Sequence, residues 1–250
     1  MLRGILLSVV LAFSTGPALA FDISEMSDDE RAIFRAEIRD YLLENPEVLM
    51  EAIAVLEERN AAESAENDAA MLDRYSAAIF EDGYSYIGGN PEGDVTVVEF
   101  LDYRCGFCKR AFPAVEELIA SDGNIKLIVK EFPILGEQSV LASQYAIAAK
   151  MVEGDAAYKS IHDALMLHKG GVNEGFLART SRQLGLNHGA ISVKMESDEV
   201  AEIIKTNRAL AQALKIQGTP SFIMGDNFVR GFVELEQMRA IVEGIRAQRG

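Results

Sequence analysis

The spacing of apolar residues changes several times along the chain and so outlines the elements of the fold. Residues 21–80 repeat apolar side chains at helical intervals. Residues 95–103 (VTVVEFLDY) and 124–135 (NIKLIVKEFPIL) are nearly continuous apolar runs with many β-branched residues, which are typical of buried strands. Helical spacing returns over residues 139–214, and residues 215–233 contain two further short apolar segments. The pattern predicts an α/β fold with a helical N-terminal region.

The helical region at residues 21–80 is predicted to contain two helices. A capping-box sequence (SDDE) begins at Ser27 and starts the first helix, whereas Asn45-Pro46 ends it and suits the start of the second. The apolar stripe extends over more residues than one small domain can cover. Because exposed apolar surface usually marks an interface, we expect residues 21–80 to form an oligomerisation stalk. The alternative is that this region packs on its own domain.

The predicted strands belong to a core that the chain builds from two separate segments. A helical stretch lies between the first two strands, and such a strand–helix–strand unit favours a parallel pair. The segment SFIMGDNFVRGFV is typical of a hairpin, and a helix over residues 234–248 follows it. We therefore expect a β/α domain formed by residues 81–138 and 215–250, interrupted by an all-helical domain at residues 139–214.

The first 20 residues have the layout of a cleavable secretory signal. Arg3 precedes an apolar run from Gly4 to Phe13, and small residues follow as far as Ala20. A membrane anchor is the alternative, but the run is shorter than the roughly 20 residues that span a bilayer. We expect residues 1–20 to be removed after Ala20 and the mature protein to be soluble in an exported compartment.

The balance of charges argues against two classes of partner. The chain has 24 basic and 39 acidic residues, which gives a net charge of −15. Removal of the signal takes away Arg3 and makes the mature protein one unit more negative. A strongly acidic protein is a poor partner for nucleic acid or for an anionic membrane surface.

Only two cysteines occur in the chain, Cys105 and Cys108, both within FLDYRCGFCKRAF. They can form a structural disulfide, a metal clip or a redox pair. A disulfide across two intervening residues constrains the unfolded chain weakly. A zinc clip normally needs further cysteine or histidine ligands, and the three histidines are neither near the pair in sequence nor spaced as a metal-binding pair. The sequence therefore predicts a redox pair and no metal site.

The position of the pair predicts which cysteine reacts. Cys105 lies where the first predicted strand ends and a helix begins, so free backbone amides and the helix dipole stabilise its thiolate. Arg104, Lys109 and Arg110 add positive charge. Because the thiolate is the attacking species in disulfide exchange, we expect Cys105 to be the nucleophile. Cys108 follows one helical turn later and is expected to be the resolving thiol.

Gly106 and Phe107 separate the two cysteines and border the reactive sulfur. We expect them to tune its redox behaviour, and since neither is a histidine, the pair should be less oxidising than a Cys-x-His-Cys pair. The disulfide between Cys105 and Cys108 would be the redox group, and no separate cofactor is predicted.

The segment QGTPSF, at the entry to a later strand, resembles the thioredoxin superfamily. In that superfamily a proline just before a strand carries a cis peptide bond and faces the cysteines, so the resemblance implies a cis bond between Thr219 and Pro220. A proline has no amide hydrogen, and the adjacent backbone groups are then open to pair with an extended substrate segment. Thr219 and Pro220 are therefore expected to belong to the catalytic site.

Two charged residues interrupt the apolar strands, Glu99 in VVEFL and Lys130 in LIVKEF. In the DsbA-like branch of the superfamily, an acidic residue and a lysine at these strand positions lie beneath the cysteines. The resemblance implies that Glu99 and Lys130 assist proton transfer or tune the thiolate. The alternative is that each charge lies at the rim of its strand.

Two longer features extend the resemblance. A helical block inserted ahead of the Thr-Pro strand is the DsbA-like arrangement of the thioredoxin fold and covers about residues 80–250. The segments ENPEVLMEAIAVLEE and FLDYRCGFCKRAFP resemble the suppressor of copper sensitivity protein C (ScsC) family. Its members are periplasmic thioredoxin-like proteins, some of which form trimers through an N-terminal helical stalk and have disulfide isomerase activity. A membrane-bound thiol reductant keeps them reduced.

These features favour a periplasmic thiol–disulfide oxidoreductase that acts as a disulfide isomerase on misoxidised exported proteins. By resemblance it would be a homotrimer, which brings several active sites to one substrate. One alternative is a monomeric DsbA-like oxidase that donates disulfides. Others are an envelope protein that binds copper(I) through the same two thiols and a purely structural coiled-coil assembly.

Overall fold

The computed structural model describes residues 26–249 of the chain. The predicted signal at residues 1–20 lies outside this part. The chain divides into two compact units, one that ends at Ala61 and one that begins at Ala62. Among the described helices, none is both long enough and apolar enough to cross a lipid bilayer.

The N-terminal unit is helical. Helix α1 (Asp28–Glu44) begins with the predicted capping box, in which Glu30 N–H donates to Ser27 Oγ and Ser27 N–H donates to Glu30 Oε2 at 2.9 Å. Asn45 ends this helix, and α2 (Glu47–Phe80) follows and runs on into the second unit. No residue of α1 is buried, so its apolar stripe is exposed.

The second unit is built on one five-stranded sheet. Its strands are β1 (Tyr86–Gly89), β2 (Val95–Leu101), β3 (Ile125–Glu131), β4 (Ser221–Met224) and β5 (Asn227–Arg230). They lie in the order β1-β3-β2-β4-β5. Strands β2 and β3 are parallel, and the other neighbours are antiparallel. The central position of β2 explains its nearly continuous apolar sequence, because both of its faces are covered.

Strand β1 lies within residues 81–94, whose sequence EDGYSYIGGNPEGD predicts turns rather than a strand. It pairs antiparallel with β3, and Tyr86 stands opposite Val129. Two of its four residues are glycines, which locally indicate a turn. A Cβ on Gly89 would approach the carbonyl oxygen of Ile125 to 2.3 Å, so glycine is required there. The pairing with β3, rather than the local sequence, makes this segment a strand.

Helices complete the second unit. Helix α3 (Gly106–Asp122) connects β2 to β3, and α9 (Leu235–Arg249) follows β5. The elements between β3 and β4 are all helices, in the block for which the sequence predicts an all-helical insertion. They are α4 (Glu137–Glu153), α5 (Asp155–Leu167), α6 (Glu174–Leu184), α7 (His188–Met195) and α8 (Asp198–Ala213).

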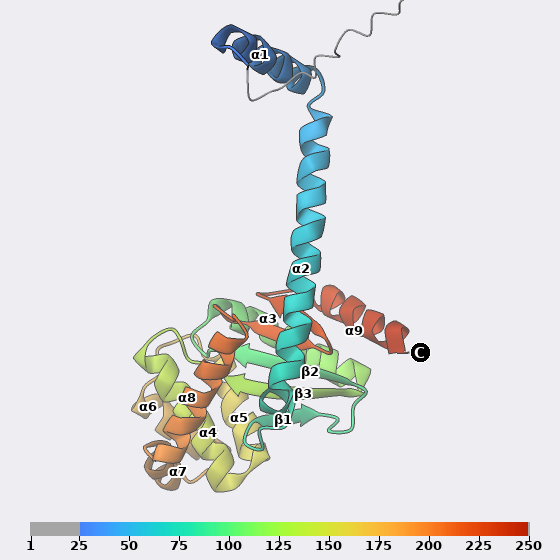
Figure 1. The fold of residues 1–250 in the computed structure, drawn as a ribbon. Helices are drawn as coiled ribbons and strands as arrows, with labels where there is room; N and C mark the ends of the chain where they lie inside the picture. The colour runs from blue at the N-terminus through green and yellow to red at the C-terminus, as the bar shows by residue number, and fades with distance from the viewer. Residues whose placement is uncertain (1–25, 250) are drawn as a thin grey trace, which may run out of the picture. The chain divides into compact units, whose positions relative to one another are not determined.

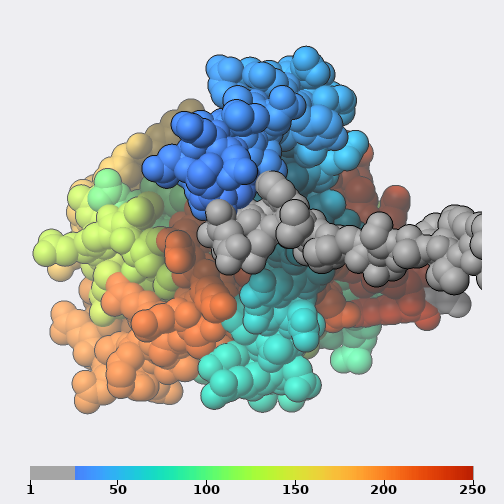
Figure 2. Space-filling view, turned by 45° about the horizontal axis from the view of Figure 1, so that its top comes forward, coloured from blue at the N-terminus to red at the C-terminus, as the bar shows by residue number. Residues whose placement is uncertain are grey.

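Helices cover both faces of the sheet, and each face has its own cluster of buried apolar residues. On one face, α3, α4, α5 and α9 pack on Val97, Leu127 and their neighbours. On the other face, the last turns of α2 and the end of α8 pack on Val98, Phe100 and Ile128. Figure 1 shows α2 crossing in front of the strands, and Figure 2 shows the end of α2 (teal) beside α8 (orange).

The end of α2 belongs to the second unit, although the predicted stalk extends to residue 80. Leu72 and Ile79 are buried in the cluster on this face of the sheet. Asp68 accepts two hydrogen bonds of 2.7 and 3.0 Å from Arg230 of β5. The boundary between the units falls near residue 61. The buried residues of α2, Leu72 and Ile79, both lie beyond the alanine-rich segment at residues 60–70.

Candidate active site

The two cysteines lie where the central strand passes into a helix. Cys105 is the N-cap residue of α3, and its N–H donates to the carbonyl of Asp102 at 3.0 Å. The buried Asp102 carboxylate fixes this turn, since it accepts from the N–H groups of Arg104 at 2.7 Å, Ile134 at 2.8 Å and Leu135 at 3.0 Å. Sequence reasoning missed Asp102, although an acidic residue directly after a buried strand is a signal that could have identified it.

The surroundings of Cys105 favour its thiolate. A hydrogen bond from the Cys108 side chain, with further hydrogen bonds from the Thr219 side chain and from the N–H groups of Cys108 and Phe107, outweighs burial and lowers the pKa of Cys105 to about 5. The backbone donors are those of the first turn of α3, where amides have no partner within the helix. Cys105 is therefore ionised at neutral pH.

Cys108 has the opposite character. Burial, followed by the hydrogen bond to Cys105 and the charge of Glu99, raises the pKa of Cys108 far above its usual range. Its side chain is fully buried. Both cysteines are free thiols in the structure, and the hydrogen bond between them places the two sulfurs together. The lowered pKa of Cys105 suits a nucleophile, and the raised pKa of Cys108 suits a resolving thiol.

The basic residues next to the pair make other contacts. Lys109 Nζ donates to backbone carbonyl groups at the end of α5. The Arg110 guanidinium lies over the rings of Phe232, at 4.5 Å from the centroid, and Phe107, at 5.5 Å. Hydrogen bonds, rather than these cations, are the main cause of the lowered pKa of Cys105.

The peptide bond between Thr219 and Pro220 is cis, as the resemblance to the thioredoxin superfamily implies. In its thiol form, Cys105 Sγ donates to the carbonyl oxygen of Thr219 at 3.0 Å, so the turn before β4 lies against the Cys105 sulfur. Thr219 and Pro220 also line a surface cavity of about 300 Å³, together with Lys215 and Arg230. The cavity provides space next to the backbone that contacts Cys105.

Gly106 and Phe107 lie at the surface between the two cysteines. A Cβ on Gly106 would meet no atom within 4 Å, so space alone does not require glycine there. The Phe107 side chain is 55% exposed. Their influence on the redox behaviour of the pair stays a prediction.

Glu99 lies on the same side of the sheet as the cysteines. It stands opposite Phe222 of β4 and is buried, and within the described residues its Oε1 has no hydrogen-bond partner. Burial, followed by the charges of Glu116 and Glu131, raises the pKa of Glu99 to about 8. Glu99 is therefore mostly protonated at neutral pH. Once it ionises, its negative charge raises the pKa of Cys108.

Lys130 lies on the opposite side of the sheet, so the structure does not bring it together with the cysteines. Glu99 pairs with Val129 in the parallel register, and the next residue along β3 points the other way. Lys130 Nζ donates to the Asp82 carboxylate and, at 2.9 Å, to the carbonyl of Ala78. This geometry corrects the expectation that Lys130 lies beneath the cysteines with Glu99.

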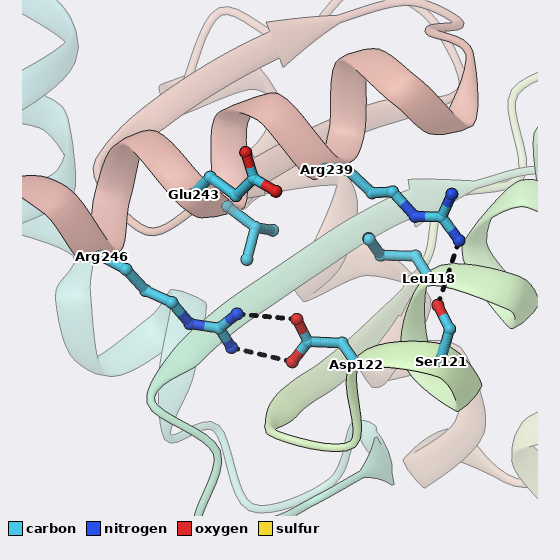
Figure 3. A pocket seen from close by; sticks show the side chains of 7 residues that line it. Leu118, Ser121, Asp122, Arg239, Glu243 and Arg246 are labelled. Carbon is cyan, nitrogen blue, oxygen red and sulfur yellow. Dashed lines mark hydrogen bonds and ion pairs between the residues drawn. The ribbon is translucent and has the colours of Figure 1, made fainter.

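A separate pocket lies at the far end of α3, where that helix meets α9 (Figure 3). It has a volume of about 280 Å³. Arg246 donates to Asp122 at 2.7 and 2.8 Å and to Asp94 at 2.7 and 2.8 Å, so these charges are paired and join the two helices to the residue that precedes the central strand β2. Within residues 26–249, no three or more Asp, Glu, His or Cys side chains are gathered as a metal site requires.

Comparison with known families identifies the fold. Residues 96–243 match the family described as DSBA-like thioredoxin domain. The chain belongs to the DSBA-like thioredoxin family. Residues 30–63 match the family described as copper resistance protein ScsC N-terminal domain, which lies within the predicted helical stalk. The DSBA-like thioredoxin fold with its preceding helical region is the architecture that the sequence predicts.

Two solved structures support this assignment. A thioredoxin-like oxidoreductase from Silicibacter pomeroyi is 42% identical with a TM-score of 0.64, over 70% of this chain and 98% of its own. A linker-deletion mutant of ScsC from Proteus mirabilis is 26% identical with a TM-score of 0.67, over 91% and 100%. A Na(+)/H(+) antiporter NhaA from Salinispora tropica is 27% identical over 63% of this chain, which spans only 24% of that protein. The chain thus has the fold and the paired thiols of a thiol–disulfide oxidoreductase of the DsbA and ScsC type.

Proposed function

We propose that the protein is a periplasmic thiol–disulfide oxidoreductase that acts as a disulfide isomerase on misoxidised exported proteins. The unequal ionisation of its two thiols carries the proposal. The Cys105 thiolate attacks a substrate disulfide, which forms a mixed disulfide and releases one substrate sulfur as a thiolate. Another substrate thiol then attacks the mixed disulfide. Cys105 leaves as the thiolate, and the substrate keeps a rearranged disulfide without net loss of electrons.

Cys108 can release a substrate whose mixed disulfide with Cys105 does not rearrange. Its sulfur attacks Cys105, the intramolecular disulfide forms and the substrate leaves reduced by two electrons. The oxidised pair must then be reduced before the next cycle, which we assign to a membrane-bound thiol reductant. The thiols themselves are the redox group of this cycle, and it uses no separate cofactor.

The backbone around Pro220 supports a role in holding substrate. Pro220 has no N–H to donate, and the neighbouring Thr219 carbonyl lies 3.0 Å from the Cys105 sulfur. The adjacent cavity leaves room for an extended segment whose disulfide reaches this sulfur. The exposed Phe107 ring offers an apolar contact beside it.

The exposed apolar residues of the N-terminal helices support self-association. They form a set on α1 and the first half of α2 that comprises Ile33, Phe34, Ile38, Tyr41, Leu43, Leu49, Met50, Ile53, Val55 and Leu56. So large an exposed apolar set favours an interface. We infer that copies of the chain associate through this part of the predicted stalk as a homotrimer, which places several Cys105 thiolates near one substrate. The match to the ScsC N-terminal domain supports this inference.

A pair of double variants of the mature protein tests the link between association and isomerisation. Replacing Ile38 and Ile53 together with glutamine removes apolar contacts, and replacing Arg39 and Glu57 together with glutamine is the matched control. Light scattering measures the mass, and reactivation of a scrambled multi-disulfide substrate measures isomerisation. We expect the first variant to be monomeric and to lose at least about tenfold in reactivation, whereas reduction of a small disulfide stays unchanged. The control should behave as the wild type.

Other outcomes would favour the alternatives. A monomeric wild type that oxidises reduced substrates, but does not reactivate scrambled ones, would favour a disulfide-donating oxidase. Tight copper(I) binding by Cys105 and Cys108 without disulfide turnover would favour a copper-binding protein.

Glu99→Gln tests whether the buried carboxyl exchanges a proton with Cys108. Because the pKa of Glu99 is about 8, the fraction that can accept a proton grows as pH rises through that value. Closure of the Cys105–Cys108 disulfide in the wild type should accelerate over the same range. The variant should lose this inflection and close about 100-fold more slowly at alkaline pH. Stopped-flow release of the second thiol from an aromatic disulfide measures the step, and an unchanged profile excludes Glu99 from it.

A further inference from the structure

Glu131 is a second buried carboxyl beside the redox centre. It is the last residue of β3 and stands opposite Leu101 of β2, while Glu99 stands opposite Val129. Since alternate residues of neighbouring strands share a face, Glu99 and Glu131 lie on the same face of the sheet. Each residue is 3% exposed. Two acidic side chains are thus buried next to each other on the side that carries the cysteines.

A cluster of hydroxyl groups surrounds Glu131. Tyr103 and Tyr158 donate to its Oε1 at 2.7 and 2.6 Å, and Ser143 donates to its Oε2 at 2.7 Å. His162 Nδ1 lies 3.1 Å from the Tyr103 hydroxyl, and burial lowers the pKa of His162 to about 3, so this ring is neutral. In the part of the chain that the structure describes, no lysine or arginine pairs with Glu131. Hydroxyl donors hold this carboxylate without a cation.

A small cavity connects the hydroxyl cluster to the edge of the sheet. It has a volume of about 10 Å³ and is lined by Glu131 and Tyr158, which is about the space that one water molecule needs. Its walls also include Tyr84, Ser85 and Lys150, which are partly exposed. The cavity thus brings Glu131 and partly exposed residues to one small space that Cys105 does not line.

We propose that Glu131 and Glu99 act as a coupled buried pair, in which ionised Glu131 keeps Glu99 protonated and so sets the pH at which Cys108 closes the disulfide. Two like charges on one buried face disfavour each other, so the pair retains a proton that an isolated carboxyl would lose. Glu131 acts through Glu99 and is a positioning residue. The inference rests on the proposed function, because it concerns the step that Cys108 carries out.

The coupled pair determines how long a mixed disulfide lasts. When Cys108 closes the disulfide, its proton passes to ionised Glu99, its sulfur bonds to Cys105, and the substrate sulfur leaves with the electron pair of the broken bond. A protonated Glu99 cannot take this proton, so closure is slow at neutral pH. The mixed disulfide then persists long enough for a substrate thiol to attack it, which favours isomerisation over release.

Another acidic residue faces Glu99 from α3. Glu116 has the same sign as Glu131 and, taken by itself, raises the pKa of Glu99 more than Glu131 does. It is partly exposed, however, and accepts a hydrogen bond of 3.0 Å from Lys159 of α5, which Asp163 shares at 2.7 Å. This cation offsets part of the Glu116 charge, and solvent screens it further.

Within the described residues, no ion pair offsets the negative charge of Glu131 as Lys159 offsets that of Glu116. Burial raises the pKa of Glu131 to about 7, even though Tyr158, Ser143 and Tyr103 donate to it, and the Asp102 charge adds to the rise. Glu131 therefore ionises at a lower pH than Glu99. Its charge is already present on the shared face over the range in which Glu99 titrates.

Glu131→Gln in the full mature protein tests the coupling, because it keeps the side-chain shape and removes the charge. The probe is a nitrobenzoate aromatic disulfide mixed with reduced protein. The first aromatic thiol released reports the attack by Cys105, and the second reports closure by Cys108. We expect the midpoint of closure, near 8 in the wild type, to fall by about one pH unit in E131Q, which makes closure at pH 7 about fivefold faster. The matched control E116Q should move the midpoint less.

A midpoint that stays in place in E131Q, or that moves no further than in E116Q, overturns the inference and leaves the proposed function intact. A slow first release, with ordinary thiol reactivity at Cys105, would instead count against the proposed function. If E131Q does not fold, Glu131→Met removes the same charge from a side chain of similar volume and must move the midpoint in the same direction.

Discussion

Cys105→Ser is expected to lower the rate of disulfide exchange by at least about 1,000-fold, because the variant has no thiolate to attack a disulfide. Cys108→Ala should keep the first attack and accumulate the mixed disulfide, since its resolving sulfur is missing. Mass spectrometry after reaction with a small disulfide distinguishes the two variants. Equal loss of the first attack in both would contradict the assignment of separate roles.

The ionisation of Cys105 gives this prediction a second, independent readout. The alkylation rate of Cys105 should follow a midpoint near pH 5, compared with about 8.5 for an ordinary thiol. Cys108→Ala should raise the midpoint, because it removes the side-chain hydrogen bond that lowers the pKa most. Since the folded pKa is below the unfolded one, ionisation stabilises the reduced protein above the ordinary thiol value. This stabilisation is lost as pH falls through about 5.

Asp82→Asn is expected to destabilise the second unit by about 3–5 kcal/mol, because it leaves the buried Lys130 ammonium without its counter-charge. Lys130 Nζ also donates to the carbonyl of Ala78, so the loss of stability should extend to the end of α2. Lys130→Met should cost less, since Asp82 keeps hydrogen bonds from Ser85 and from the Tyr84 N–H. Urea unfolding measures the free-energy differences.

An exposed ion pair provides the control for this measurement. The side chains of Lys205 and Glu202 are 75% and 62% exposed, so Glu202→Gln should change the unfolding free energy by less than about 1 kcal/mol. Equal losses of unfolding free energy in Asp82→Asn and Glu202→Gln would show that the buried ion pair stabilises the protein no more than the exposed one.

The same buried pair gives stability a predictable pH dependence. Burial acts to raise the pKa of Asp82, but hydrogen bonds from Lys130 and Ser85 outweigh it and lower that pKa. The stabilisation from Asp82 is therefore complete above the ordinary aspartate value and is lost as pH falls through the lower folded value. Asp82→Asn should lose this acid dependence.

Features that depend on short local patterns could be predicted from the sequence. The capping box at Ser27, the placement of Cys105 at a helix start and the cis bond at Pro220 each lie in a segment of a few residues. The order of strands and helices also predicted a β/α core interrupted by helices. The resemblance carried by the cysteine pair and QGTPSF implied the thioredoxin fold, which the match over residues 96–243 confirms.

Features that depend on strand register could not be predicted in this way. Glu99 and Lys130 both interrupt apolar runs and look alike in sequence, yet they lie on opposite faces, because an offset of one residue between paired strands reverses the face. The same dependence concealed Glu131, which directly follows Lys130 and shares the face of Glu99. Strand β1 was missed for a related reason. Gly88 and Gly89 favour a turn locally, and the segment becomes a strand because it pairs with β3.

The ion pair between Asp68 and Arg230 joins the end of α2 to β5. Arg230 also lines the cavity beside Pro220. Both residues belong to the second unit, so the end of α2 helps to hold one wall of that cavity in place. A sequence change at Asp68 is therefore expected to alter the shape of the cavity even though Asp68 does not line it.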